Sequence, residues 1–124
     1  MAEYKVPEAA LAVAREAAQR IRALEAEALA ALHEKNDPAA HRAGMTEKCL
    51  VLEALPEEAE AHLPDPATPD TAAFAAGLED FAKRAGMALS LESIFFMGAL
   101  LYPDDYQDGE PNDLERYLDR FEAQ

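Results

Sequence analysis

Hydrophobic residues recur at intervals of three and four through the first third of the chain, and this spacing constrains the fold more than any other feature. It places them on one face of an α-helix over residues 7–35. Many of them are alanines, whose small side chains let a neighbouring helix approach closely. We therefore expect a long helix whose buried face comprises Leu11, Ala14, Ala17, Ile21, Leu24, Ala28 and Leu32.

A second helix is expected to fold back against the first. The sequence "KNDP" interrupts the periodic pattern, and within it Asp37 can cap a new helix whose first turn begins with Pro38. Pro56 should kink or restart this helix, so that residues 56–63 form a fresh segment with an acidic first turn. Residues 7–62 are thus predicted to form a helical hairpin. The inward residues of its second helix are expected to be Met45, Cys49, Leu52 and Leu55.

Prolines separate this hairpin from the C-terminal helices. Residues 63–70 contain three prolines and form the predicted linker. Thr68 and Pro69 can open a third helix, which Gly86 should end. Ser90 can cap a fourth helix. The expected inward face of the third helix comprises Phe74, Leu78, Phe81, Ala82 and Ala85.

The segment Leu91–Tyr102 is apolar on all sides. We expect a helix, because the sequence offers no second strand to pair with it. A helix of this kind either lies at the centre of the bundle or contacts another chain, and both alternatives stay open. A last helix follows, with Asn112 and Glu115 at the spacing of a capping box. Its apolar stripe comprises Leu114, Tyr117, Leu118 and Phe121.

Together these patterns predict an all-α protein. We expect one domain over residues 1–124, built as a bundle of about five helices. Its parts are the N-terminal hairpin (7–62), the linker (63–70) and the C-terminal helices (71–122).

Acidic residues are concentrated in the second part of the chain. The formal net charge is −14, of which residues 49–124, with seventeen acidic and four basic side chains, contribute −13. Such a surface repels nucleic acid and anionic lipid, whereas it attracts basic proteins or divalent cations. Solubility alone is the other explanation of the charge.

The sequence also bears on location. Cys49 is the only cysteine, so no internal disulfide can form, and the N-terminus lacks the pattern of a signal peptide. The longest apolar run, from Ile94 to Tyr102, has nine residues, far fewer than the roughly 20 needed to span a membrane. We expect a cytoplasmic protein without a membrane segment.

An acidic loop near the C-terminus resembles the calcium loop of EF-hand proteins. With Gly109 at the sixth position, the loop begins at Asp104 and ends at Glu115, and Asp108 takes the fifth position. Tyr106 at the third position and Pro111 at the eighth depart from the pattern. The alternative is an acidic turn followed by a helix that Asn112 and Glu115 cap without metal. If a cation binds, Asp104, Asp108 and Glu115 are its expected chief ligands.

Other chemical motifs are weak. His41, Met45 and Cys49 share one helix face and could ligate a soft metal, but that face must also supply the core. The chain contains no Glu-x-x-His motif, glycine-rich phosphate loop or G-x-S-x-G motif. We therefore expect neither an enzyme nor a cofactor.

The sequence favours an acidic interaction module, such as an adaptor, chaperone or inhibitor, that binds a basic protein surface. The alternative is a regulator that binds a divalent cation in the loop over residues 104–115. We also expect self-association, because the apolar segment and the alanine-rich stripe can each support a helix contact. The residues expected at partner interfaces are Glu57, Glu58, Glu60, Asp105, Phe95, Phe96 and Met97.

Overall fold

The protein is an all-α helical bundle, which confirms the predicted fold class. The structure is a computed structural model that describes residues 5–122, and within this range it contains five helices and no strand. None of these helices is both long and apolar enough to cross a membrane. The helices are α1 (Glu8–Glu34), α2 (Pro38–Glu60), α3 (Pro69–Ser90), α4 (Ile94–Ala99) and α5 (Asp113–Glu122).

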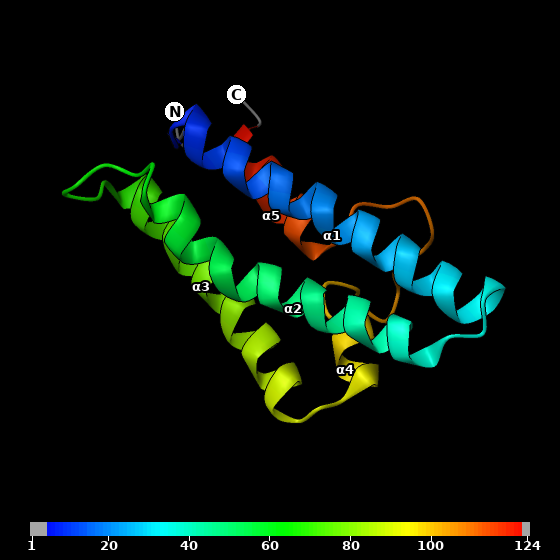
Figure 1. The fold of residues 1–124 in the computed structure, drawn as a ribbon. Coiled ribbons are helices and arrows are strands. Elements are labelled where there is room, and N and C mark those ends of the chain that lie inside the picture. The colour runs from blue at the N-terminus through cyan, green and yellow to red at the C-terminus, as the bar shows by residue number, and fades with distance from the viewer. Residues whose placement is uncertain (1–4, 123–124) are drawn as a thin grey trace.

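The long helices lie side by side, with α2 between α1 and α3 (Figure 1). Helices α1 and α2 form the predicted antiparallel hairpin, and α5 packs against α1 and α3. Small residues permit close contact within the hairpin, since a side chain at Gly44 would come within 2.9 Å of the Ala28 Cβ atom. The predicted inward residues Met45, Cys49, Leu52 and Leu55 are all buried.

Helix α2 continues through Pro56, so of the predicted kink or restart at that residue the restart is wrong, while the kink stays a prediction. Proline removes one backbone hydrogen bond and crowds the preceding turn. Leu52 and Leu55 before it and Ala59 after it are nevertheless fully buried, and their packing holds the helix together. As a result, Glu57, Glu58 and Glu60 lie in the last turns of a helix and not in the first turn of a new one.

Helix α3 likewise passes Gly86, where the sequence predicted its end, and continues to Ser90. The glycine makes room for a neighbouring side chain: a Cβ atom at this position would lie 2.8 Å from the Glu53 carboxylate of α2. The inward residues Phe74, Leu78, Phe81 and Ala85 are buried as predicted, whereas Ala82 is partly exposed.

The apolar segment after α3 forms only the short helix α4, which Ser93 caps in place of the predicted Ser90. Met97, Leu100 and Leu101 turn toward the core, while Phe95 and Phe96 are exposed. The segment is therefore not a central helix enclosed by the others. Loop 100–112 then leads to α5, whose Leu114, Leu118 and Phe121 are buried.

Candidate functional site

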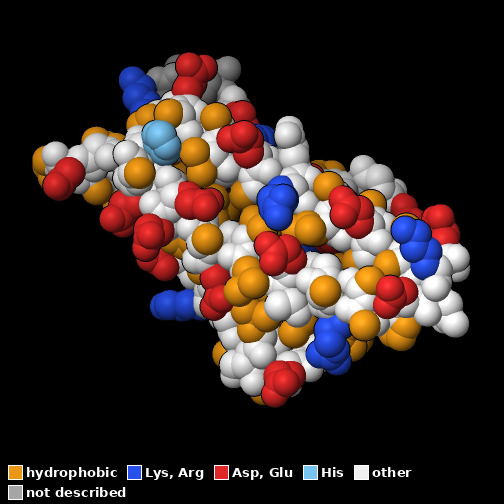
Figure 2. Space-filling model, viewed as in Figure 1, with side chains coloured by type: hydrophobic (Ala, Val, Ile, Leu, Met, Phe, Trp, Pro, Cys, Tyr) orange, Lys and Arg blue, Asp and Glu red, His pale blue; other side chains and the backbone are white. Residues whose placement is uncertain are grey.

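Three glutamates form an exposed acidic surface at the C-terminal end of α2. We call Glu57, Glu58 and Glu60 the acidic surface; each is exposed, and none makes an ion pair with another residue in the range 5–122. Figure 2 shows acidic side chains gathered over this end of α2. No basic residue occupies the last turn of the helix. The negative end of the helix dipole and the carboxylates therefore repel one another.

In the loop that resembles an EF-hand, the predicted ligands do not gather around one position. Asp104, Asp105 and Asp108 are exposed, but the Glu115 carboxylate accepts two hydrogen bonds from Arg22, at 2.7 Å and 3.1 Å. Glu115 and Asn112 also exchange two hydrogen bonds in the predicted capping box. Across the described residues, no group of three or more His, Cys, Asp or Glu side chains could hold a metal ion.

Arg22 fastens this loop to α1. Besides binding Glu115, its guanidinium donates to the Glu110 carbonyl at 2.9 Å and to the hydroxyls of Tyr102 and Tyr106, both at 3.3 Å. The hydrogen bonds to Glu115 raise the pKa of Arg22 despite its partial burial. Burial alone would raise the pKa of Glu115, but the bonds from Arg22 and the Asn112 N–H outweigh it and lower that pKa.

A buried charged cluster lies beside the loop, and the sequence analysis missed it. Lys48 is completely buried; its ammonium lies 2.9 Å from Glu25 and donates to the Leu100 carbonyl at 2.8 Å. Tyr102 donates to the other Glu25 oxygen. Burial lowers the pKa of Lys48, against the opposing effect of Glu25, and burial also raises the pKa of Tyr102.

A signal for this cluster does exist in the sequence. Lys48 follows Met45 by three residues and precedes Leu52 by four, so it falls on the buried face of α2. A lysine at such a position requires an internal partner. Because its contacts are made within the protein, the cluster positions the loop.

The residues considered for a soft metal site belong largely to the core. Met45 and Cys49 are buried, while His41 is partly exposed. Burial also raises the pKa of the Cys49 thiol, which disfavours the thiolate form that binds metals.

Exposed apolar side chains gather where α3 leads into α4. Phe95 is 72% exposed and Phe96 52%, whereas Met97, predicted at the same interface, is buried at 3%. Met87 and Leu91 are also exposed, at 65% and 57%. We call Met87, Leu91, Phe95 and Phe96 the aromatic surface. Both phenylalanines were predicted from the sequence to lie at a partner interface.

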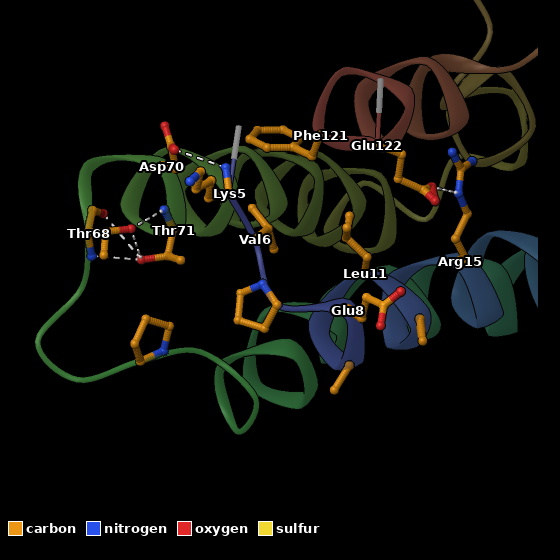
Figure 3. Close-up of a pocket in the computed structure, with 14 residues that line it drawn as sticks. Lys5, Val6, Glu8, Leu11, Arg15, Thr68, Asp70, Thr71, Phe121 and Glu122 are labelled. Carbon is orange, nitrogen blue, oxygen red and sulfur yellow. Dashed lines mark hydrogen bonds and ion pairs between the residues drawn. The ribbon is translucent and has the colours of Figure 1, made fainter. Parts of the chain in front are cut away.

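A groove of about 1180 Å³ lies at the opposite end of α3, between the start of α1 and the end of α5 (Figure 3). Most polar groups in this view are already paired. The Lys5 N–H donates to Asp70, Thr68 and Thr71 form a capping box, and Arg15 binds Glu122. The side chains of Lys5 and Glu8, which also line the groove, make no ion pair among the described residues.

No known protein family, curated protein or solved structure matches this chain. Its function must be argued from the surfaces described above.

Proposed function

We propose that this protein is a small interaction module that binds a basic protein through the acidic surface. The observation that carries the proposal is the position of Glu57, Glu58 and Glu60 at the C-terminal end of α2. Carboxylates at this end of a helix weaken the fold, and none of the three makes an ion pair within the described residues. Side chains that lower stability in this way are typical of binding surfaces, where a partner supplies the missing opposite charge.

The charge of the remaining surface supports a basic partner. Residues 49–124 carry a net charge of −13, and Asp104, Asp105 and Asp108 add a second exposed acidic group on the loop before α5. A field of this sign accelerates the approach of a basic protein and opposes binding to nucleic acid or anionic lipid. The module would act as an adaptor, chaperone or inhibitor.

We also propose that the protein binds a partner without catalysing a reaction, and that it is located in the cytoplasm. The bonds of Lys48, Glu25 and Tyr102 to one another support the first point, because they occupy the groups that could otherwise act on a substrate. The single cysteine, Cys49, buried and unpaired, supports the second. Self-association through the aromatic surface is also proposed.

Two triple variants with the same change in net charge test the partner proposal. The first is Glu57→Gln/Glu58→Gln/Glu60→Gln; the matched control is Asp104→Asn/Asp105→Asn/Asp108→Asn. Each protein is immobilised and used to capture partners from its native cell extract at low and high salt. We expect the first variant to lose a basic partner that the control retains, and high salt to release that partner from the wild type.

Equal loss of binding in both variants would indicate general charge attraction and contradict a defined acidic surface. Binding that resists high salt would contradict the charge-based proposal altogether. If only the loop variant loses binding and calcium modulates the effect, the regulator that binds a divalent cation would replace the proposed module.

A further inference from the structure

The aromatic surface has the size of the largest apolar patch on a typical monomer. Six large hydrophobic side chains are strongly exposed among the described residues, and four of them, Met87, Leu91, Phe95 and Phe96, lie together where α3 meets α4. With each side chain presenting roughly 100 Å² or more, the apolar area is on the order of 500 Å². Patches of this size commonly mark an interaction site.

Its shape combines a projecting side chain with a neighbouring pocket. Phe95 is the most exposed of the four, and its ring centre lies 5.5 Å from that of Phe96. On the other side, Phe96 and Met87 border a pocket of about 310 Å³ whose further apolar walls include Ala88, Leu100 and Leu101. A surface that carries both a projection and a pocket can bind a copy of itself about a twofold axis.

The charges around this surface also fit a second copy. Lys83 and Arg84 are the only basic residues between Lys48 and Arg116, and Arg84 borders the pocket. Lys83 precedes Met87 by one helical turn and makes no ion pair among the described residues, whereas Arg84 binds Asp80. Glu92 lies three residues before Phe95 and is exposed. Asp113 also lines the pocket, so this region carries charges of both signs, with Lys83 as the positive side chain that no acid pairs among the described residues.

We propose that two copies of this chain associate through the aromatic surface. Phe95 of each copy enters the pocket between Met87 and Phe96 of the other. In this arrangement Glu92 of one copy pairs with Lys83 of the other, twice in the dimer. A basic partner would instead meet the unpaired Lys83, so it is better suited to the acidic surface on α2.

The proposal extends the self-association named above and does not depend on the acidic surface. The variant Glu57→Gln/Glu58→Gln/Glu60→Gln should leave the dimer intact, and Phe95→Ala should leave capture of a basic partner intact. Loss of one interaction can thus be distinguished from loss of the other.

Sedimentation of the full chain over a range of protein concentrations tests the proposal. We expect a reversible dimer in the micromolar range, because the contact is of modest size. Phe95→Ala should raise its dissociation constant about tenfold or more, as for a central interface residue. Leu50→Ala is the matched control, because Leu50 is an exposed apolar side chain on α2, outside the aromatic surface. It should change the dissociation constant less than about twofold.

Charge-reversal variants and NMR test which residues form the contact between the two copies. Lys83→Glu and Glu92→Lys should each weaken the dimer several-fold, and the double variant should recover most of the loss. In a mixture of isotope-labelled and unlabelled protein, the Phe95 ring should show contacts between copies to Met87 and Leu100. A monomer at high micromolar concentration, or a dimer unaffected by Phe95→Ala, would overturn the proposal. Displacement of the dimer by a basic partner bound at Phe95 would also overturn it.

Discussion

The ammonium of Lys48 lies 2.9 Å from the carboxylate of Glu25 in the interior of the bundle, between α1, α2 and loop 100–112. A buried ion pair of this kind adds little net stability compared with apolar side chains, because both charges lose their hydration. The pair instead fixes the position of the segment after α4. Lys48 donates a hydrogen bond to the Leu100 carbonyl, and Tyr102 donates one to Glu25.

Removing only the lysine charge should therefore be costly. We expect Lys48→Met to lower the free energy of unfolding by about 3–5 kcal/mol, because Glu25 is left without its counter-ion. The double variant Lys48→Met/Glu25→Gln should recover much of the loss, since it leaves no unpaired charge. Urea denaturation of the three proteins measures both effects. Full stability of Lys48→Met would show that Glu25 can reach water or take up a proton.

The ion pair of Arg22 with Glu115 should make the free energy of unfolding depend on pH in the acid range. The folded-state pKa of Glu115 lies below its ordinary value of 4.5, so the stability linked to this group is fully present above that value. It is lost as pH falls through the lower folded-state pKa. In Arg22→Gln the pKa of Glu115 should rise, and this part of the acid dependence should disappear. NMR titration of Glu115 and urea denaturation at neutral and acid pH test this; an unchanged Glu115 pKa would contradict it.

The acidic surface should reduce the stability of the isolated protein. We expect Glu57→Gln, Glu58→Gln and Glu60→Gln each to raise the free energy of unfolding by a few tenths of a kcal/mol, because each removes a negative charge from the negative end of α2. Glu8→Gln, in the first turn of α1, is the matched control and should have the opposite sign. Thermal unfolding at low salt compares them. Destabilisation by the α2 changes would remove the main support for the proposed binding surface.

Gly77 should tolerate no side chain. A Cβ atom there would overlap the Tyr117 hydroxyl, which donates to the Ala73 and Phe74 carbonyls of α3. We expect Gly77→Ala to destabilise the protein by about 1–3 kcal/mol as α5 is pushed away. Gly98→Ala, where the nearest atom is the Met45 sulfur at 4.0 Å, should be neutral or slightly stabilising. Equal effects in urea denaturation would contradict this close contact.

Calcium should bind the loop over residues 104–115 no more tightly than about millimolar, the weak end of the EF-hand range. Tyr106 replaces a carboxylate ligand, and Arg22 already holds Glu115. Titration calorimetry with calcium measures the affinity. Micromolar binding that disappears in Asp104→Ala and Glu115→Ala would show that the arginine gives way to the metal.

The sequence by itself determined the helices and most of their inward faces. The spacing of Met45, Cys49 and Leu52 predicted burial correctly, and the capping box of Asn112 and Glu115 was recognised from two residues three apart. Both features are local, since the residues that define each lie within one to about two helical turns.

The tertiary structure decided where the helices end and which residues, distant in the sequence, contact one another. Burial of Ala59 beyond Pro56 and of Ala88 beyond Gly86 carried α2 and α3 past their expected ends. Arg22 and Glu115 are far apart in the sequence, and only the return of α5 against α1 brings them together. Contacts of this kind depend on how helices pack in space, and the periodicity of a single helix cannot specify its partner.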